Sequence, residues 1–401
     1  MDAHRPPPLA GRRVLDLSRV LAGPWCTMVL ADLGAEVIKV ENPKGGDDTR
    51  HWGPPYAGGE AAYYLCANRN KKSVAIDLST ADGQGLVRDL AARSDVLVEN
   101  YKLGGLDKFG LGYASIAAIN PAIVYCSISG YGRSSPRAEL PGYDYVIQAE
   151  GGLMAITGET DGAPMKVGVA VADLFTGMAA AQAILAALLA RDRDGVGQHI
   201  DMALYDCQLA MLANVGSAHL VSGAEPKRYG NGHPNIVPYD MFDTVDGGVV
   251  IAVGNDRQFT SLCTLMKRPE LAVDARYATN ARRVENRAEL LGLLRPLVAK
   301  ETTAFWLAGL GAAGIPGGAV RKVGQALAAP ETHARDMVRT VSHPTAGEVS
   351  LIGSPLKLSQ TPTATAQAPP LLGADTDAVL GGLLGLEAER LAQLRSGGAI
   401  R

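Results

Sequence analysis

Residues 166–191, KVGVAVADLFTGMAAAQAILAALLAR, place one aspartate between a run of alternating valines and a long apolar segment. Valine alternates with small residues over 167–171, a pattern that predicts a buried strand. Residues 178–190 are rich in alanine and leucine and carry no charge, which predicts a helix. Asp173 therefore lies where the strand is expected to end and the helix to begin.

Asp173 has two interpretations at this junction. Aspartate is a favoured N-cap, so the residue could simply cap the helix. The free N–H groups and the positive end of the helix dipole also favour a negative charge there, which would keep a nucleophilic carboxylate ionised. Thr176 and Gly177 keep the neighbouring side chains small. This stretch alone leaves both interpretations open.

The composition indicates a large globular protein without a polyanionic partner. With 401 residues, 47% of them hydrophobic and 20% charged, the chain is long enough for a sizeable core and two domains. The net charge of −3 gives no sign of a nucleic-acid or membrane partner. Residues 1–13 lack the apolar core of a signal peptide, and residues 178–190 are too few to cross a bilayer. We therefore expect a cytoplasmic protein.

The motifs of several common enzyme classes are absent from the sequence. No GxGxxG follows a predicted strand, and no GxxxxGK[ST], GxSxG or HExxH occurs. Dinucleotide enzymes, nucleoside triphosphatases, serine hydrolases and zinc proteases are therefore disfavoured. The histidines show no ligand spacing, so we predict no metal site. The five cysteines are scattered without a CxxC, which indicates reduced, mostly buried thiols.

Short strands alternate with helices through the first part of the chain. Strands are predicted at 13–17, 36–41, 73–78, 96–99 and 123–128, and helices at 21–33, 84–92 and 113–119. This order predicts an α/β fold, in which a mostly parallel sheet carries helices on both faces. Ligands bind such sheets in the loops at the carboxyl ends of the strands, so a site is expected there.

Changes in composition predict a second domain. Residues 1–220 are expected to form the large domain, and residues 221–238, rich in Gly, Pro and Asn, a linker. Residues 239–325 are expected to form a small domain that opens with a hairpin turning at Asp246-Gly247-Gly248. Residues 326–401 would return to the large domain and end in a helix near 375–394.

Seven segments, mostly in the predicted strand-end loops, carry a resemblance to a known family. In chain order they are RVLAGP (19–24), VIKVENPKGGDDTRHW (37–52), NRNKKSVAIDL (68–78), VENYKLGGLDKFGLGY (98–113), ISGYG (128–132), GYDYVIQAEGG (142–152) and VADLFTGM (171–178). Together they resemble the class III CoA-transferases, the CaiB/BaiF family, which includes formyl-CoA transferase and succinyl-CoA:dicarboxylate CoA-transferases. The resemblance extends from about Leu9 to the C-terminus. It implies a Rossmann-like large domain with a parallel sheet, a smaller α+β domain and an interlocked homodimer.

The resemblance identifies Asp173 with the catalytic aspartate of the family and puts Tyr143 and Asp144 beside the thioester. In that chemistry the aspartate attacks an acyl-CoA, for which succinyl-CoA is a candidate. The CoA thiolate then returns to form an aspartyl-CoA thioester, which a small carboxylic acid attacks in turn. Each step exchanges one acyl leaving group for another. Coenzyme A is thus a substrate, and no metal or redox cofactor is expected.

By the same resemblance, residues from several loops bind CoA, namely Val20, Leu21, Ala22, Asn42, Ile76, Asn100, Tyr101, Lys102 and Lys108. A lysine suits a phosphate as a point charge. Asn42 and Ser79 replace an arginine and a lysine of the family pattern. Three other lysines are alternatives for the missing charge, namely Lys44, Lys71 and Lys72.

Four further residues are expected around the acyl group. Arg50 and Trp52 resemble positions that line the acyl pocket, and Arg50 would pair with the distal carboxylate of a dicarboxylic acyl group. Gly232 and His233 lie roughly where formyl-CoA transferase carries a mobile glycine loop. His233 would contact the acceptor carboxylate.

Two alternatives to a transferase remain at this point. One is an acyl-CoA racemase or epimerase of the same family, whose members carry Gly-His-Asp where this chain has Gly142-Tyr143-Asp144. A tyrosine, with an ordinary pKa of about 10, exchanges an α-proton less readily at neutral pH than a histidine does, which favours the transferase. The other alternative is a noncatalytic CoA-binding protein.

Overall fold

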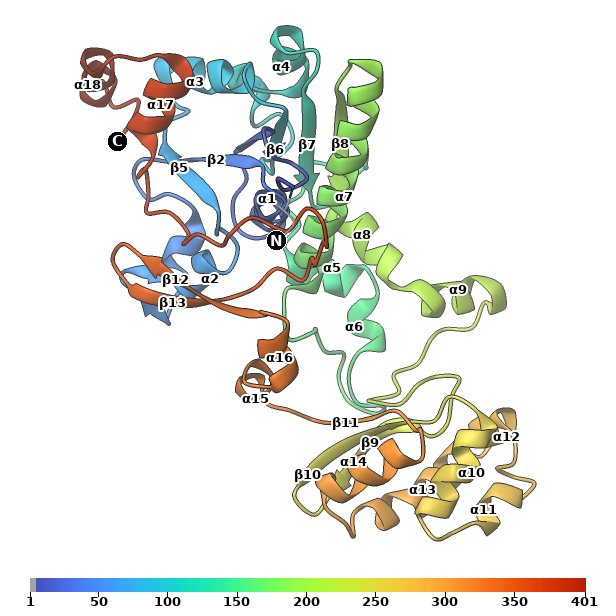
Figure 1. The fold of residues 1–401 in the computed structure, drawn as a ribbon. Coiled ribbons are helices and arrows are strands. Elements are labelled where there is room, and N and C mark those ends of the chain that lie inside the picture. Colours follow the sequence, from blue (N-terminus) through green and yellow to red (C-terminus); the bar gives the residue numbers. More distant parts are fainter. Residues whose placement is uncertain (1–4) are drawn as a thin grey trace. The chain divides into compact units, whose positions relative to one another are not determined.

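The computed structural model describes residues 5–401, which form two compact units (Figure 1). The first unit comprises the chain up to Leu153 together with Val167–Gly223 and Pro330–Arg401. The second comprises Met154–Lys166 and Ala224–Ala329. The second unit therefore includes residues 224–238, which were expected to be a linker, and a segment from within the expected large domain.

A six-stranded parallel sheet forms the centre of the first unit, in the order β5-β2-β1-β6-β7-β8. Its strands are β1 (Arg13–Asp16), β2 (Glu36–Glu41), β5 (Lys71–Ala75), β6 (Val96–Glu99), β7 (Val124–Ser129) and β8 (Gln198–Ala203). Val14 of β1 pairs with Val37 of β2 and with Val96 of β6, so apolar positions align across the centre of the sheet. The predicted α/β fold with a parallel sheet is confirmed.

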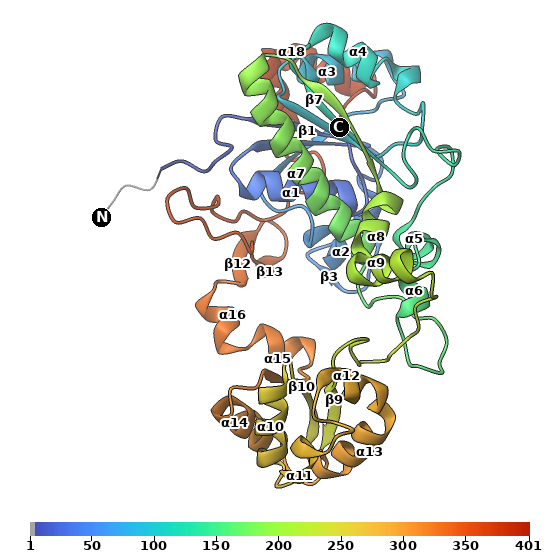
Figure 2. The same cartoon turned by 90° about the vertical axis from the view of Figure 1, so that its right-hand side faces the viewer.

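Helices cover both faces of this sheet because its strands are apolar on both faces. Val14 and Val37 face one pair of helices, α1 (Ala22–Asp32) and α7 (Val171–Asp194), which lie together in Figure 2. Leu15 and Ile38 face the other set, α3 (Ala81–Ala91), α4 (Tyr113–Ile119), α17 (Thr376–Leu384) and α18 (Ala388–Ser396).

Shorter elements complete the first unit. They are the 3₁₀ helices η1 (Asp48–His51) and η2 (Asp107–Phe109), the strands β3 (Tyr56–Ala57) and β4 (Glu60–Ala61), the hairpin of β12 (Val338–His343) and β13 (Gly347–Ile352), and the helices α2 (Ala62–Leu65), α5 (Asp144–Glu150), α8 (Leu204–Met211), α9 (Ala213–Ser222) and α16 (Pro330–Ala334). Helix α6 (Leu153–Ile156) lies at the boundary between the two units.

The prediction of a strand at 167–171 is wrong. Residues 167–170 belong to no strand, and α7 already begins at Val171. The backbone N–H of Val167 donates to the side chain of Gln148 at 2.9 Å instead of to a neighbouring strand. Alternating valines give the period of a strand, but a strand also needs a partner along its edge. Asp173 consequently lies in the first turn of a helix and not at a strand end.

Helix α7 is also longer than the predicted 178–190. Its 24 residues make it long and apolar enough to cross a membrane by length and composition, which corrects the expectation drawn from the shorter run. In the first unit α7 packs against α1 and α8, and its residues Ala180, Ile184 and Leu188 are buried in the core. A core helix of a soluble protein has the same composition and packing.

The second unit is α+β. Its sheet has the order β11-β10-β9 and is antiparallel, with β9 (Tyr239–Thr244), β10 (Gly247–Ala252) and β11 (Gly317–Ala319). The hairpin predicted to turn near Asp246-Gly247 is confirmed. Phe242, Phe259 and Trp306 are buried in its core. The helices are α10 (Asp256–Leu265), α11 (Glu270–Val273), α12 (Asn280–Glu285), α13 (Arg287–Val298), α14 (Thr303–Ala312) and α15 (Val323–Leu327).

The end of the chain returns to the first unit as predicted, where α17 contacts β5 and α3. It forms two helices, α17 and α18, and not the single helix expected near 375–394. Gly385 ends α17 in the left-handed conformation, with φ of 70°. Glycine adopts this conformation without steric cost, so it is a common helix terminator.

Two ion pairs are fully buried beside β1, β2 and β5. Lys71 Nζ lies 3.1 Å from Asp16 Oδ2, and Lys39 Nζ lies 2.9 Å from Asp47 Oδ2. Burial alone would raise the pKa of Asp47, but the Lys39 ammonium outweighs it and lowers that pKa to about 2. The Lys39–Asp47 pair is therefore charged at neutral pH, and each partner depends on the other.

Replacing Lys39 with methionine should destabilise the first unit strongly. The substitution leaves Asp47 buried without its counter-ion, at an expected cost of about 3–5 kcal/mol in the free energy of unfolding. Lys72 is the matched control, because its half-exposed ammonium pairs with Glu36 at the surface and Lys72→Met should cost less than about 1 kcal/mol. Urea unfolding followed by circular dichroism measures both. Equal losses for the two variants would contradict the role given to Lys39.

Candidate active site

Asp173 lines a cavity of about 350 Å³ at the carboxyl ends of the strands. The other walls come from the loops that follow β1, β6 and β7, and include Val20, Leu21, Ala22, Asn100, Tyr101, Lys102, Gly130 and Tyr143. These loops lie far apart in sequence and meet only because the strands that precede them are parallel. The cavity therefore lies where the parallel sheet predicted a site.

A second cavity, of about 570 Å³, adjoins the first. Arg19, Tyr101 and Lys102 line both cavities. The second is also lined by Asn42, Lys44, Ile76, Ser79 and Lys108. Every residue that the resemblance assigned to CoA thus lines one of the two cavities. Together they offer a continuous site for an elongated ligand that ends at Asp173.

The alternatives for a phosphate-binding lysine differ sharply in their surroundings. The Lys71 ammonium is buried and bonds to Asp16, Asn68 and the Pro24 carbonyl. The Lys72 ammonium pairs with Glu36. Of these three lysines, only Lys44 lines the second cavity. Asn42 does so as well, and its Oδ1 accepts the backbone N–H of Lys44 at 2.9 Å, which fixes the turn that carries this lysine.

The backbone of Val20, on the wall of the first cavity, is strained. Its φ of 70° lies in the left-handed region, where a β-branched residue is rarely found. The N–H of Val20 donates to Oδ1 of the buried Asp47 at 3.2 Å, which helps to hold this conformation. Strain of this kind is often retained at functional sites, where surrounding structure compensates for its cost.

Asp144 caps the helix that carries Asp173. Its Oδ1 accepts the backbone N–H groups of Ala172 at 2.8 Å and of Asp173 at 3.3 Å. The N-cap position itself is Ala170, which has no side chain for the purpose. Within residues 5–401, no hydrogen bond is formed to the Asp173 carboxylate. Of the two interpretations, simple capping by Asp173 is therefore wrong, because another helix supplies the cap.

The surroundings of Asp173 make its carboxylate unusually basic. Burial, and secondarily the negative charge of Asp144, raise the pKa of Asp173 to about 7. Tyr63, on α2, faces the same carboxylates, and burial together with the charge of Asp173 raises the pKa of its hydroxyl to about 12. Trp52 packs edge-to-face on Tyr63, with ring centroids 5.3 Å apart. Trp52 is not among the residues that line the Asp173 cavity, so its contact with an acyl group stays a prediction.

Tyr63 was missed by sequence reasoning. It follows the quoted motif 37–52 and precedes the motif 68–78, in the stretch AAYYL. The only signal there was a pair of tyrosines, of which Tyr64 is fully buried. On a short helix adjacent residues point in different directions, so one tyrosine of such a pair is free to face a neighbouring site.

Arg50 requires a correction. It was expected to pair with a substrate carboxylate, but only 5% of it is exposed and its guanidinium is occupied within the protein. Nη2 lies 2.7 Å from Glu41 Oε1, and Nη1 lies 2.8 Å from Glu60 Oε1. Nη2 also donates to the hydroxyl of Tyr64. Two buried carboxylates, nine and ten residues away in the sequence, hold the arginine, and its role is structural.

Tyr143 lies at the mouth of the site and is 64% exposed. It precedes α5, and Gly142 before it packs against Gly130 at the end of β7. A Cβ on Gly142 would lie only 2.4 Å from the Cα of Gly130, so no larger residue fits this approach. The contact anchors the Tyr143 loop beside the cavity.

Gly232 and His233 belong to the second unit, so their contact with an acyl group stays a prediction. The N–H of Gly232 donates to the Tyr229 carbonyl at 2.9 Å. The His233 ring packs on Tyr239, and its Nδ1 accepts the N–H of Asn235. These contacts form a compact turn that carries the imidazole of His233.

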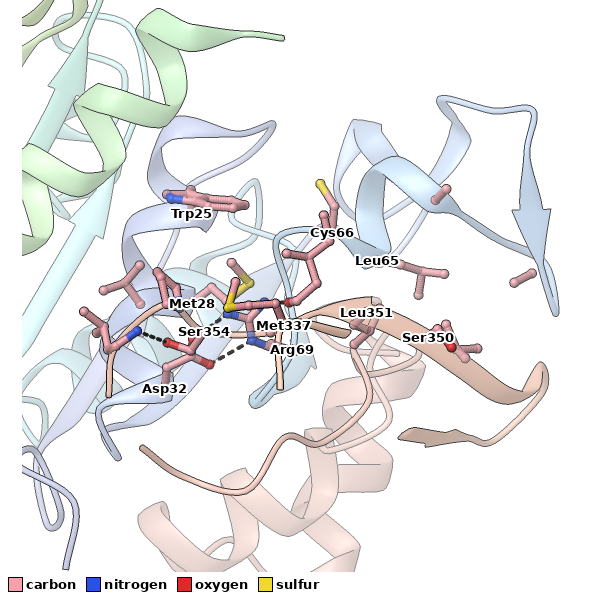
Figure 3. A pocket seen from close by; sticks show the side chains of 18 of the residues that line it. Trp25, Met28, Asp32, Leu65, Cys66, Arg69, Met337, Ser350, Leu351 and Ser354 are labelled. Carbon is pink, nitrogen blue, oxygen red and sulfur yellow. Dashed lines mark hydrogen bonds and ion pairs between the residues drawn. The ribbon is translucent and has the colours of Figure 1, made fainter. Parts of the chain in front are cut away.

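A third cavity, of about 470 Å³, is apolar and lies between α1, α2 and the β12–β13 hairpin (Figure 3). Trp25, Met28 and Leu351 are among its walls. Its charged lining residues, Asp32 and Arg69, pair with each other, as the dashed lines in Figure 3 mark. The Cys66 thiol on its walls donates to the Tyr63 carbonyl, so this cavity offers no counterpart of the basic carboxylate at Asp173.

No group of three or more His, Cys, Asp or Glu suited to a metal ion occurs in the described part of the chain. Four cysteines are buried and Cys66 is exposed. Although Cys66 reaches solvent, the protein around its sulfur withdraws the thiol from water and raises its pKa, so this cysteine is a weak nucleophile at neutral pH.

Comparisons with known proteins show the family to which this chain belongs. Residues 9–376 match the family CoA-transferase family III. The chain is 46% identical to the succinate–glutarate CoA-transferase of Agrobacterium fabrum, over 96% of this chain and 98% of that one. It is 45% identical to the succinyl-CoA:glutarate CoA-transferase of Mus musculus, over 100% of this chain and 92% of that one. A crystal structure of a CAIB/BAIF family protein from Brucella suis superposes with a TM-score of 0.85 at 46% identity, covering 94% of this chain and 100% of that one. The chain therefore belongs to CoA-transferase family III, the CaiB/BaiF family, and moves CoA between an acyl-CoA and a carboxylic acid.

Proposed function

We propose that this CoA-transferase takes CoA from succinyl-CoA and passes it to a short dicarboxylic acid such as glutarate, through covalent intermediates on Asp173. The position of Asp173 carries the proposal. It is a partly buried, basic carboxylate on the wall of the cavity that also holds the residues expected to bind CoA. The names of the similar proteins from Agrobacterium fabrum and mouse support this choice of donor and acceptor.

The first half-reaction loads CoA onto the enzyme. An oxygen of Asp173 attacks the thioester carbonyl, the carbon–sulfur bond breaks, and CoA leaves as a thiolate from a mixed anhydride. The thiolate then attacks the aspartyl carbonyl of this anhydride and expels the donor acid as a carboxylate. An aspartyl-CoA thioester remains. One negative charge passes from group to group, so no external proton is needed.

The second half-reaction repeats these steps in reverse. The acceptor carboxylate attacks the aspartyl-CoA thioester, CoA thiolate leaves, and the thiolate attacks the acceptor's carbonyl in the new anhydride. Acceptor-CoA is released and the Asp173 carboxylate is restored. No step requires a metal or a redox cofactor.

The raised pKa of Asp173 suits this exchange. An ordinary aspartate has a pKa of about 3.9 and a thiol about 8.5, so an aspartyl anhydride is normally far less stable than a thioester. A pKa of about 7 brings the basicity of Asp173 closer to that of the thiolate. The anhydride then lies nearer in free energy to the thioester that forms it.

The CoA phosphates would be bound by the cations of the second cavity. Lys44, Lys102 and Lys108 line it, and Arg19 lies where the two cavities adjoin. Each is a charge-assisted donor for phosphate oxygens. Lys39 and Lys71 are excluded from this role because buried carboxylates already neutralise them.

We further propose that the enzyme is a homodimer, interlocked as in the family to which it belongs, and that it acts in the cytoplasm. Helix α9 supports an association. None of its residues is buried, and Leu220 and Val221 are 84% and 89% exposed. Two adjacent apolar side chains held in water on a regular helix are typical of an interaction surface.

Asp173 should be the site of a covalent adduct. Wild-type protein mixed with succinyl-CoA and trapped with hydroxylamine should carry a hydroxamate on the peptide that contains Asp173, as measured by mass spectrometry. Asp173→Asn removes the nucleophile while keeping the shape, and turnover should fall about 10³-fold or more. Asp82→Asn, at an exposed aspartate on α3 that pairs with Arg390, is the control and should keep both adduct and turnover. An adduct that persists in Asp173→Asn would disprove the assignment.

Adduct formation should be faster at higher pH. Only ionised Asp173 attacks, and its carboxylate loses its proton as pH rises through about 7. Below that midpoint the rate should fall about tenfold for each unit of pH. Quenched single-turnover reactions between pH 5.5 and 8.5, with saturating succinyl-CoA, measure this dependence. A rate that stays constant down to pH 5.5 would mean that the local environment leaves Asp173 as acidic as a surface aspartate.

The homodimer predicts a mass in solution of twice the 41.9 kDa of the chain. Light scattering after gel filtration measures it. Replacing both Leu220 and Val221 with serine should weaken the dimer if α9 contributes to the interface. A wild-type chain that elutes as a monomer at micromolar concentration would rule out the proposal.

A further inference from the structure

Gln148 is a fully buried amide directly behind the candidate site. It lies in α5, one turn after Asp144, and is 0% exposed. Its Oε1 accepts the N–H of Val167 at 2.9 Å, and its Nε2 donates to Asp144 Oδ2 at 2.7 Å. Because Val167 offers a donor, the amide oxygen must face Val167. The amide nitrogen is therefore directed at Asp144.

Asp144 in turn is held by both of its oxygens. Oδ2 accepts from Gln148, and Oδ1 accepts from the N–H groups of Ala172 and Asp173. Donors on two elements thus converge on a single carboxylate, which fixes its orientation. A connected series of bonds runs from the amide of Gln148 through Asp144 to the backbone of Asp173.

We infer that Gln148 is a positioning residue of the transfer reaction: it holds the Asp144 carboxylate against the first turn of α7 and thereby sets the charge that Asp173 experiences. The inference rests on the proposed role of Asp173 as nucleophile. Gln148 lines neither of the two cavities, so it acts on Asp173 only through Asp144. A catalytic role for Gln148 itself is not implied.

The chemistry of the position favours glutamine over its nearest substitutes. A methionine would fill the same space but leave Asp144 without its Nε2 donor and Val167 without an acceptor. A glutamate would keep the bond from Val167. Protonated, it would donate to Asp144 as the amide does, but ionised, it would repel Asp144. The cavity that Asp173 lines also carries the ionisable side chains of Arg19, Lys102, Glu139 and Tyr143. Asp144 and Tyr63 interact electrostatically with Asp173, and Gln148 adds no charge to these groups.

The test compares the pH dependence of adduct formation in full-length wild type, Gln148→Met and Gln148→Glu, from pH 5.5 to 9.5 with succinyl-CoA. In Gln148→Met, Asp144 is released or protonated, so the acidic midpoint should move to lower pH. The turnover number should fall about 10- to 100-fold, as expected for loss of a bond to a charged group, with KM for succinyl-CoA changed less than about threefold. Gln148→Glu should match wild type at low pH and lose activity at high pH, a decline that wild type lacks.

Gln393→Met is the control. Gln393 is exposed on α18 and lines neither cavity, so the same substitution there should leave the pH profile unchanged. A purely structural role for Gln148 would lower stability without changing either limb of the profile. If Gln148→Met fails to fold, the pH profile of Gln148→Glu alone tests the inference, because glutamate keeps the side-chain volume and the hydrogen bond from Val167.

Two outcomes would separate this inference from the proposed function. If wild type forms the Asp173 adduct and Gln148→Glu keeps the wild-type profile over the whole range, the positioning role is wrong and the nucleophile stands. If wild type forms no adduct under the same conditions, the proposed function itself is wrong, and the inference with it.

Discussion

The hydrogen bonds from the first turn of α7 to Asp144 Oδ1 are the interaction on which the rest of the site depends. A helix N-terminus needs an acceptor for its free N–H groups, and the side chain of a Ser, Thr, Asp or Asn at the N-cap is the usual source. Here the acceptor comes from α5, across 28 residues of sequence. Asp173 is thereby released from capping and remains available for chemistry. The same bonds put a negative charge beside Asp173, which adds to the effect of burial and keeps its carboxylate basic.

The charged groups of the first unit divide into structural and available ones. Three cations are buried and neutralised by carboxylates of the same chain, and their role is structural, namely Lys39, Lys71 and Arg50. Lys44 and Lys108 line the adjoining cavity without such a buried partner. A cation buried with its counter-ion gains little by leaving it for a ligand, whereas an exposed lysine can exchange water for phosphate. Burial thus separates the cations that are available to a phosphate from those that are not.

The sheet could be predicted from the sequence because it depends on local patterns, whereas the CoA residues were named from the family resemblance and stay predictions. Alternation of strands and helices fixes a parallel sheet, and its strand-end loops carry the quoted motifs. The strand at 167–171 could not be excluded, since the valine pattern is the same whether or not a partner strand exists. The surroundings of Arg50 depend on Glu41 and Glu60, which only the folded chain brings together. The cap from Asp144 and the orientation of Tyr63 depend on contacts between separate segments of the chain. The residue pattern of a single segment does not predict such contacts.

The most direct test of the account is the transfer of oxygen from the acceptor to Asp173. The enzyme is given succinyl-CoA and glutarate labelled with ¹⁸O in its carboxylates, and the peptide containing Asp173 is weighed after turnover. In the proposed sequence the labelled carboxylate forms an anhydride with Asp173, and CoA thiolate removes the acyl group by attack on the acceptor's own carbonyl. The bridging oxygen stays on the aspartate, so the peptide should gain one ¹⁸O atom in a single turnover. Formation of glutaryl-CoA with no label on Asp173 would contradict the covalent route.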